Sequence, residues 1–107
     1  MQIPLSDWPA GLCREIAAIE PSAVTENLAS RLVFDRDQDD LAAFSAAIFT
    51  IDGVPFALQL YDQIPTGHFT LIVTTNLSGD QTSVENFLTW SGVPRSAVRW
   101  ERSSLGG

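Results

Sequence analysis

The chain of 107 residues contains no lysine, one histidine and one cysteine. Without lysine, Schiff-base catalysis and a P-loop lysine are excluded. Cys13 has no second cysteine with which to form a disulfide. One cysteine and one histidine also cannot supply the three or four ligands of a usual zinc site. We therefore expect a reducing compartment, the cytoplasm, because small secreted domains often depend on disulfides.

The sequence also lacks a long apolar run and a positive net charge. No stretch approaches the roughly eighteen unbroken apolar residues of a membrane span, and residues 1–9 do not resemble a signal peptide. Thirteen acids against six arginines give a formal net charge of −7. Because this charge repels phosphate backbones and anionic lipids, we expect neither nucleic acid nor membrane among the partners.

What the chain does contain is typical of a globular domain. Hydrophobic residues make up 45% and charged residues 18%, with six Phe, three Trp and one Tyr. These aromatic side chains supply enough bulk for a core without a metal or a disulfide. We predict a single domain over residues 1–102 and a flexible tail over residues 103–107.

Two amphipathic stretches near the N-terminus predict a pair of helices. The first is indicated by apolar residues three and four positions apart, as on one face of a helix. These residues are Trp8, Leu12, Ile16 and Ile19. Pro21 is expected to end this helix, because the residue before a proline is disfavoured in the helical conformation. Ser22 then caps the second helix. Its apolar residues are Val24, Leu28 and Leu32.

Residues 35–40 read Asp-Arg-Asp-Gln-Asp-Asp, which predicts a polar loop. A calcium-binding EF-hand loop starting at Asp35 would need glycine at its sixth position and a bidentate glutamate at its twelfth, but Asp40 and Ala46 stand there. A phosphotransferase site of the Asp-x-Asp type would need a cation and further carboxylates that we cannot identify. We expect a solvated loop without a metal, although weak binding of a divalent cation stays open.

Asp52-Gly53 between two apolar runs is the strongest local signal and is typical of a two-residue type I′ hairpin. Such a turn fixes the register, so Ile51 pairs with Val54 and Phe49 with Phe56. Because side chains alternate along a strand, one apolar set falls on a core face. This set consists of Ala47, Phe49, Ile51, Val54, Phe56, Leu58 and Leu60.

Further elements lie on either side of this hairpin. Residues 41–51 fit either a helix capped by Asp40 or, at least from about Ala46, the first strand of the hairpin. His68 to Thr75 is rich in β-branched residues and predicts a third strand. A capping box, Thr-Ser-Val-Glu, opens a helix over residues 82–90, and Val98–Trp100 predicts a short fourth strand. The fold class is therefore α+β, with two N-terminal helices, a three-stranded antiparallel meander and a C-terminal helix.

No catalytic set emerges from the motifs. His68 has no identifiable nucleophile, and a pairing with Asp62 across the turn would serve equally to stabilise the hairpin. The glycine-rich signatures of hydrolases and dinucleotide-binding domains are missing. Cys13 is expected to be a small buried hydrophobe rather than a reactive thiol. We predict no catalytic residue, no cofactor and no enzymatic activity.

The second face of the hairpin is the surface on which we expect a partner. Phe44 is predicted to lie opposite Tyr61 there, on a face too apolar for full exposure. A covering layer of helices is one expectation for this face, and an exposed docking surface is the alternative. The candidate partner-binding residues on this face and at the C-terminal edge are Phe44, Ile48, Gln59, Tyr61, Trp100 and Arg99.

Two functions fit these observations. The first is a non-enzymatic acidic module that binds another protein, such as an immunity- or antitoxin-like inhibitor or a small chaperone or adaptor. Its charge would steer association with a basic partner, and a homodimer is a further option. The second is a small ligand-binding or enzymatic domain with a pocket between the sheet and the N-terminal helices. A cavity lined by Tyr61, Asp62 and His68 would favour the second.

Overall fold

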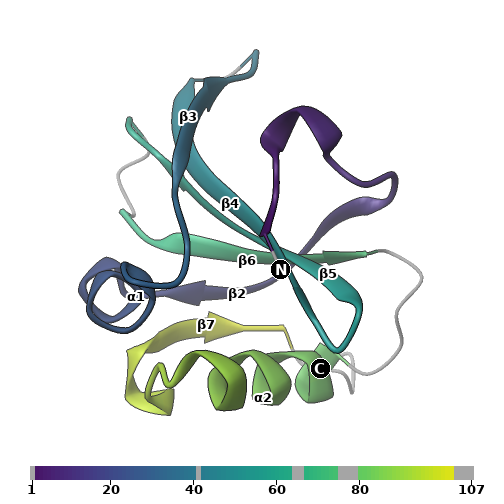
Figure 1. Ribbon diagram of the computed structural model, residues 1–107. Coiled ribbons are helices and arrows are strands. Elements are labelled where there is room, and N and C mark those ends of the chain that lie inside the picture. Colours follow the sequence, from purple (N-terminus) through teal and green to yellow (C-terminus); the bar gives the residue numbers. More distant parts are fainter. Residues whose placement is uncertain (1, 41, 64–66, 75–79, 103–107) are drawn as a thin grey trace.

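One antiparallel sheet dominates the molecule (Figure 1). The structure is a computed structural model that describes residues 2–40, 42–63, 67–74 and 80–102. Within these residues seven strands form the sheet in the order β1-β4-β5-β6-β2-β7, and β3 pairs with β4 beside β1. The strands are β1 (Gln2–Ile3), β2 (Leu12–Ile19), β3 (Asp35–Gln38), β4 (Ala43–Ile51), β5 (Val54–Tyr61), β6 (Phe69–Thr74) and β7 (Val98–Glu101). The helices are α1 (Pro21–Leu28) and α2 (Asp80–Ser91), and the 3-10 turns are η1 (Leu5–Asp7) and η2 (Arg95–Ala97).

The predicted fold class, with two N-terminal helices and a three-stranded meander, is wrong. Strands β4, β5 and β6 do form a meander, but it is the centre of a larger sheet. The first predicted helix is strand β2, and the predicted acidic loop contains strand β3. The described part of the chain is mostly β, as a single domain with a radius of gyration of 12.9 Å.

Strand β2 resembles a helix in sequence because it is buried on both faces and contains bulges. Its register against β6 shifts between Leu12 and Arg14 and again between Glu15 and Ala17. Leu12 therefore belongs to the cluster under one face, whereas Ile16 belongs to the core on the other. An extra residue at a bulge changes the phase of the alternation. The apolar residues consequently fall at helix-like spacings in an extended strand.

Helix α1 begins at Pro21, one residue before the predicted cap. Proline suits the first helical position, because its missing N–H would have no partner there and its φ is already helical. Glu20 is the N-cap residue in place of Ser22. Val24 and Leu28 are buried as the apolar stripe predicted.

The hairpin at Asp52-Gly53 is confirmed in turn and register. Asp52 and Gly53 both have positive φ, 52° and 78°, as type I′ geometry requires. Phe49 pairs with Phe56, and Phe44 with Tyr61, in the predicted alignment. The strand before the turn starts at Ala43, so the ambiguous stretch is a strand from that residue onward.

The main core lies between the first face of the sheet and the two helices, which pack on the same side. Phe49 stacks on Phe56 at 6.0 Å and on Trp90 of α2 at 4.9 Å between ring centroids. Phe87 of α2 and Leu28 of α1 are fully buried in the same cluster. The predicted core face of the hairpin is therefore confirmed as a core face.

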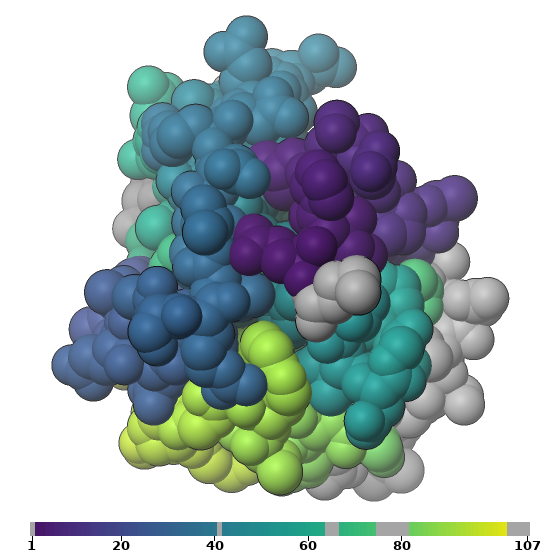
Figure 2. Space-filling model, in the orientation of Figure 1, coloured from purple at the N-terminus to yellow at the C-terminus, as the bar shows by residue number. Residues whose placement is uncertain are grey.

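The N-terminal residues 2–8, which we call the hook, cover part of the second face (Figure 2). Figure 1 shows this segment in purple, curling over the sheet beside β4. Ile3, Leu5 and Trp8 pack there on a small cluster. The cluster consists of Leu12, Ile48, Ala57 and Ile72. The Trp8 indole Nε1–H also donates to the Leu12 carbonyl at 2.7 Å. A hook of strand and 3-10 turn thus takes the place of the expected layer of helices.

The C-terminal elements are close to the prediction. Helix α2 begins at Asp80, two residues before the predicted capping box, and Gly92 follows its end with a φ of 80°. The predicted fourth strand is β7, which pairs with β2. The predicted tail over residues 103–107 and Thr75, the last residue of the predicted third strand, lie outside the described residues. Neither of the described helices is long and apolar enough to cross a membrane.

Candidate functional site

The open edge of β3 is the main candidate surface. In the described chain β3 pairs only with β4, which leaves its outer edge without a neighbouring strand. Its four residues are all exposed. Two of them are Asp35 and Asp37, and Asp39 and Asp40 follow directly. We call these four aspartates the acidic edge; it stands at the upper end of Figure 1.

The one cation within this segment does not neutralise the acidic edge. Arg36 alternates to the opposite face, where its guanidinium donates to the Ser45 hydroxyl at 2.9 Å and to Asp62 Oδ1 at 2.8 Å. The hydrogen bond and charge of Arg36 lower the pKa of Asp62. Within the described residues, Asp35 and Asp37 have no ion pair. The negative charges of Asp35 and Asp37 are therefore open to a partner.

The backbone of β3 offers few free groups to another strand. The Asp39 N–H donates to the Ala42 carbonyl at 3.2 Å, which closes the β3–β4 hairpin. Because antiparallel pairs alternate, Arg36 and Gln38 then direct their backbone groups away from β4. The Gln38 N–H already donates to Asp37 Oδ1 at 2.8 Å. Recognition at this edge thus depends mainly on side chains.

Tyr61 lies beside the acidic edge on the second face of the sheet. Its hydroxyl donates to Asp39 Oδ2, and its ring packs edge-to-face on Phe44 at 5.5 Å. The hydrogen bond to Asp39, together with partial burial and the negative charge of Asp39, raises the pKa of Tyr61 to about 12. A weaker hydrogen bond with Gln59 acts in the opposite direction. The phenol consequently stays protonated and ties the turn after β3 to β5.

The structure places three of the predicted partner-binding residues inside the molecule. Phe44 and Gln59 are 7% and 9% exposed, and Ile48 is fully buried beneath the hook. Tyr61 is half-buried and accessible beside the acidic edge. Of the predicted residues on the second face, Tyr61 is therefore the one that a partner can reach without displacing the hook.

Trp100 and Arg99 lie on β7, on the far side of the sheet from the acidic edge. Trp100 is 49% exposed, and the Arg102 guanidinium lies 5.7 Å from its ring centroid. Arg99 donates to Glu20 through Nε at 2.7 Å, and Arg95 pairs with Glu101 at 2.7 Å. The predicted residues thus form two separate surfaces, and the arginines at the second one are largely neutralised by acids.

An apolar groove of about 280 Å³ lies between α1 and the first face of the sheet. It is lined by Pro21, Val24, Thr25, Ala29, Phe34, Ser45, Leu60 and Phe69. The groove lies where the pocket of a ligand-binding domain was expected, between the sheet and an N-terminal helix. Its lining, however, contains none of the predicted residues Tyr61, Asp62 and His68. Tyr61 lies on the opposite face, and Asp62 is paired with Arg36.

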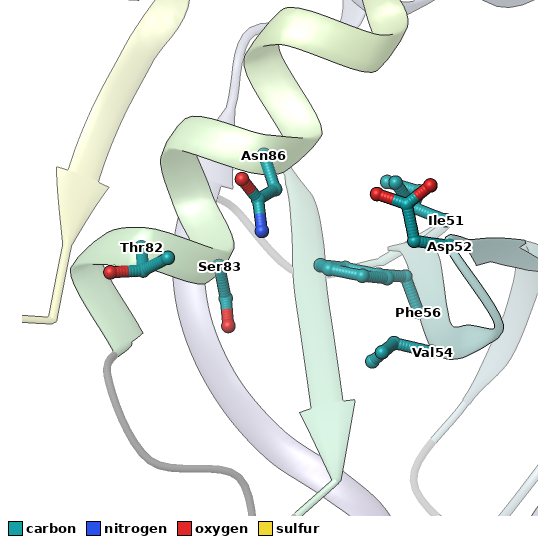
Figure 3. Close-up of a pocket in the computed structure, with 7 residues that line it drawn as sticks. All are labelled: Ile51, Asp52, Val54, Phe56, Thr82, Ser83 and Asn86. Atoms are coloured by element: carbon teal, nitrogen blue, oxygen red, sulfur yellow. The ribbon is translucent and has the colours of Figure 1, made fainter.

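A smaller cleft of about 190 Å³ separates the tip of the β4–β5 hairpin from the first turns of α2 (Figure 3). Apolar side chains form its floor, and a carboxylate, two hydroxyls and a carboxamide are arranged around it. The lining residues are Ile51, Asp52, Val54, Phe56, Thr82, Ser83 and Asn86. No feature of the sequence had indicated this cleft, because it joins segments thirty residues apart.

The described residues contain no cluster of potential metal ligands. No three or more His, Cys, Asp and Glu side chains there are placed to hold a metal ion. Cys13 is exposed, so the prediction that it is buried is wrong. Its position on a bulged strand turns it outward, between the buried Leu12 and the half-buried Arg14.

The comparisons with known proteins found no match. No family model matches it, and no curated protein and no solved structure matches it. The function must therefore be argued from the geometry and charge of the chain itself.

Proposed function

We propose that this protein is a non-enzymatic binding module whose acidic edge docks a basic, extended segment of another protein. The observation that carries the proposal is the open β3 edge, where Asp35, Asp37 and Asp40 are exposed without ion pairs in the described residues. Potentials of opposite sign across an interface steer encounter and fix orientation. The half-buried Tyr61 supplies an aromatic surface beside these charges.

A basic partner is favoured over a second copy of the chain. Two β3 edges placed side by side would bring aspartates against aspartates, and like charges directly opposite each other destabilise strand pairing. Charged edges commonly protect sheets from joining in this way. A segment rich in arginine or lysine would instead be attracted to this edge, because each of its cations could pair with a carboxylate. Such a partner suits an inhibitor or adaptor of the immunity or antitoxin type, acting in the cytoplasm.

The test is a binding titration with a designed peptide. The probe is a fluorescently labelled peptide of alternating arginine and valine, and its anisotropy is followed at low salt. The double variant Asp35→Asn/Asp37→Asn should weaken binding about fivefold, because two exposed charge contacts of about 0.5 kcal/mol each are lost. The same peptide with glutamate in place of arginine should not bind.

A charge-matched double variant distinguishes local binding at the acidic edge from attraction by the overall negative charge of the protein. Asp7→Asn/Glu26→Gln also removes two exposed negative charges, but on the hook and on α1. We expect this variant to weaken binding less than about twofold, through the loss of long-range steering alone. Equal losses in the two double variants would show that binding is not localised at β3 and would overturn the proposal.

The groove between α1 and the sheet supports a second candidate function, a small ligand-binding domain. Its lining is mostly apolar, with Thr25 and Ser45 as polar groups, as in many small-molecule sites. Under this candidate, millimolar indole should shift the NMR signals of Phe34 and Phe69 and leave those of β3 unchanged. Under the first proposal the basic peptide should produce the reverse pattern.

A further inference from the structure

Strand β7 forms a second open edge of the sheet. Within the described residues it pairs only with β2, and it lies at the opposite end of the strand order from β3 (Figure 1). Its residues include Arg99, Trp100 and Glu101, of which Trp100 is 49% exposed. An open edge offers unpaired backbone groups to another strand, and an exposed aromatic side chain beside them adds an apolar contact.

The backbone on either side of Trp100 is directed outward. The Arg102 N–H donates to the Ile16 carbonyl of β2 at 2.7 Å. Because bonded and non-bonded pairs alternate in an antiparallel ladder, Trp100 also directs its N–H and carbonyl to β2. In a trans peptide unit the N–H and the carbonyl point in opposite directions. The Arg99 carbonyl and the Glu101 N–H therefore point away from β2, one on each side of Trp100.

We propose that two copies of the chain join their β7 edges around a two-fold axis at Trp100. The Glu101 N–H of each copy then donates to the Arg99 carbonyl of the other. The two Trp100 residues face each other as a non-hydrogen-bonded pair, in which side chains approach most closely. Aromatic cross-strand pairs of this kind stabilise a sheet. Because both copies use the same surface, the association closes at a dimer.

The charges beside Trp100 select this register. Arg99 donates to Glu20, which directly precedes α1, and Glu101 accepts from Arg95, which is in turn bound to α2. Arg99 and Glu101 therefore share the face that the helices cover. Pairing around Trp100 places Arg99 of each copy opposite Glu101 of the other. Pairing around Arg99 or around Glu101 would place like charges opposite each other, which destabilises a sheet.

The ion pairs within each copy extend this complementarity. Arg99 of one copy would lie between its own Glu20 and the Glu101 of the second copy, whose other partner is Arg95. The charges alternate in sign along this row, from Glu20 through Arg99 and Glu101 to Arg95. Such a network stabilises an interface more than isolated exposed pairs do.

Two features limit the strength of the dimer. The register of β2 against β7 shifts between Ala18 and Ile19, and a bulge of this kind restricts further pairing to the residues around Trp100. Each copy also carries a net charge of −7, which opposes association at low salt. A contact of one short strand belongs to the weak interfaces below roughly 1,200 Å², so we expect a dissociation constant of about 0.1–1 mM. The proposal concerns the edge opposite β3 and does not depend on the proposed function.

The experiment is sedimentation equilibrium of the full chain from about 10 µM to about 1 mM, in about 150 mM NaCl to screen the net charge. The mean mass should rise from 11.7 kDa toward twice this value. A mass that stayed at 11.7 kDa over the whole range would overturn the proposal. A mass that passed twice this value would indicate open-ended association, with β3 of one copy on β7 of the next, and would overturn it as well.

Charge reversal tests the register. Arg99→Glu and Glu101→Arg should each weaken self-association more than about tenfold, because each places like charges opposite each other on both sides of Trp100. Glu101→Arg is the sharper test, because it changes the net charge from −7 to −5 and would strengthen a dimer governed by net charge alone. An equimolar mixture of the two variants should dimerise again, since opposite charges then face each other. Stronger association of Glu101→Arg, or a monomeric mixture of folded variants, would contradict the register.

A third variant tests the central contact. Trp100→Ala should weaken the dimer about fivefold, because the cross-strand aromatic pair is lost. Asp35→Asn/Asp37→Asn is the control at the opposite edge, and it should not weaken the dimer, because it lowers the repulsion between copies and leaves β7 intact. The same double variant weakens peptide binding under the proposed function, so the two proposals fail independently. Loss of the dimer in the β3 variant, or an unchanged dimer in Trp100→Ala, would overturn the β7 interface.

Discussion

At the scale of single residues, Tyr61 has the most clearly defined environment. It is the only tyrosine of the chain. Its hydroxyl donates to Asp39 and its ring packs on Phe44. A donor beside a carboxylate loses its proton reluctantly, because deprotonation would leave two negative charges in contact. Its ionisation therefore reports on the contact between β5 and the turn after β3.

We predict that the ultraviolet titration of tyrosinate in the folded protein has its midpoint at about 12, against the ordinary value of 10.0. Since no second tyrosine contributes, the absorbance follows this one group. Asp39→Asn removes the charge and should bring the midpoint back toward 10.0. A midpoint at 10.0 in the wild-type protein would contradict the hydrogen bond between Tyr61 and Asp39.

The sign of the linked stability follows from the direction of this shift. The pKa of Tyr61 is higher in the folded state, so the folded state holds the proton more tightly. The stabilisation is complete below pH 10 and is lost as the pH rises through about 12. In the Tyr61→Phe variant, the free energy of unfolding should not show this loss between pH 10 and about pH 12.

At the scale of elements, the sequence predicts an element well where local geometry decides the structure. The Asp52-Gly53 turn sets its own backbone angles, and it fixes the pairing of β4 with β5. Strand β2 was misread because its burial on two faces and its bulges reproduce a helical spacing. Strand β3 was missed because its residues have low strand propensity and pair only through contact with β4.

The candidate site was predictable only in part, for a related reason. Alternation along the hairpin placed Phe44 opposite Tyr61 correctly. The hook that buries Ile48 joins residues more than forty positions apart, and no local signal marks such a contact. The bond between Tyr61 and Asp39 likewise spans separate elements. Long-range pairing decides which part of the second face stays open.

The hook gives a prediction at this scale. Trp8→Ala removes a half-buried indole from the second cluster and its hydrogen bond to the Leu12 carbonyl. We expect a loss of about 2 kcal/mol in the free energy of unfolding, measured by urea denaturation. The loss is smaller than for a fully buried tryptophan, because Trp8 keeps some solvent contact.

Trp100→Ala is the matched control for this variant. The same side chain is deleted, but from an exposed position on β7. We expect it to cost less than about 0.5 kcal/mol, as for most surface substitutions. If both variants lost the same amount, the hook would not be packed on the second face in solution.

At the scale of the whole molecule, negative charge is in excess and unevenly placed. Arg36, Arg95 and Arg99 each form an ion pair with an acid. Within the described residues Asp35, Asp37 and Asp40 lie outside these pairs, in a chain with a net charge of −7. At neutral pH the folded chain therefore experiences net repulsion, which unfolding relieves by moving the charges apart.

Added salt should accordingly stabilise the protein at neutral pH. Raising NaCl from about 20 to about 300 mM shortens the screening length from roughly 20 Å to roughly 6 Å and weakens the repulsion more than the close ion pairs. We expect a gain of about 1 kcal/mol, or roughly 4–8 °C in Tm by circular dichroism. Near the isoelectric pH of about 4.3 the net charge vanishes, and the effect of salt should vanish with it. A Tm that fell with salt at neutral pH would mean that the ion pairs of Arg36, Arg95 and Arg99 outweigh the repulsion, and the acidic edge would then not dominate the field that a basic partner meets.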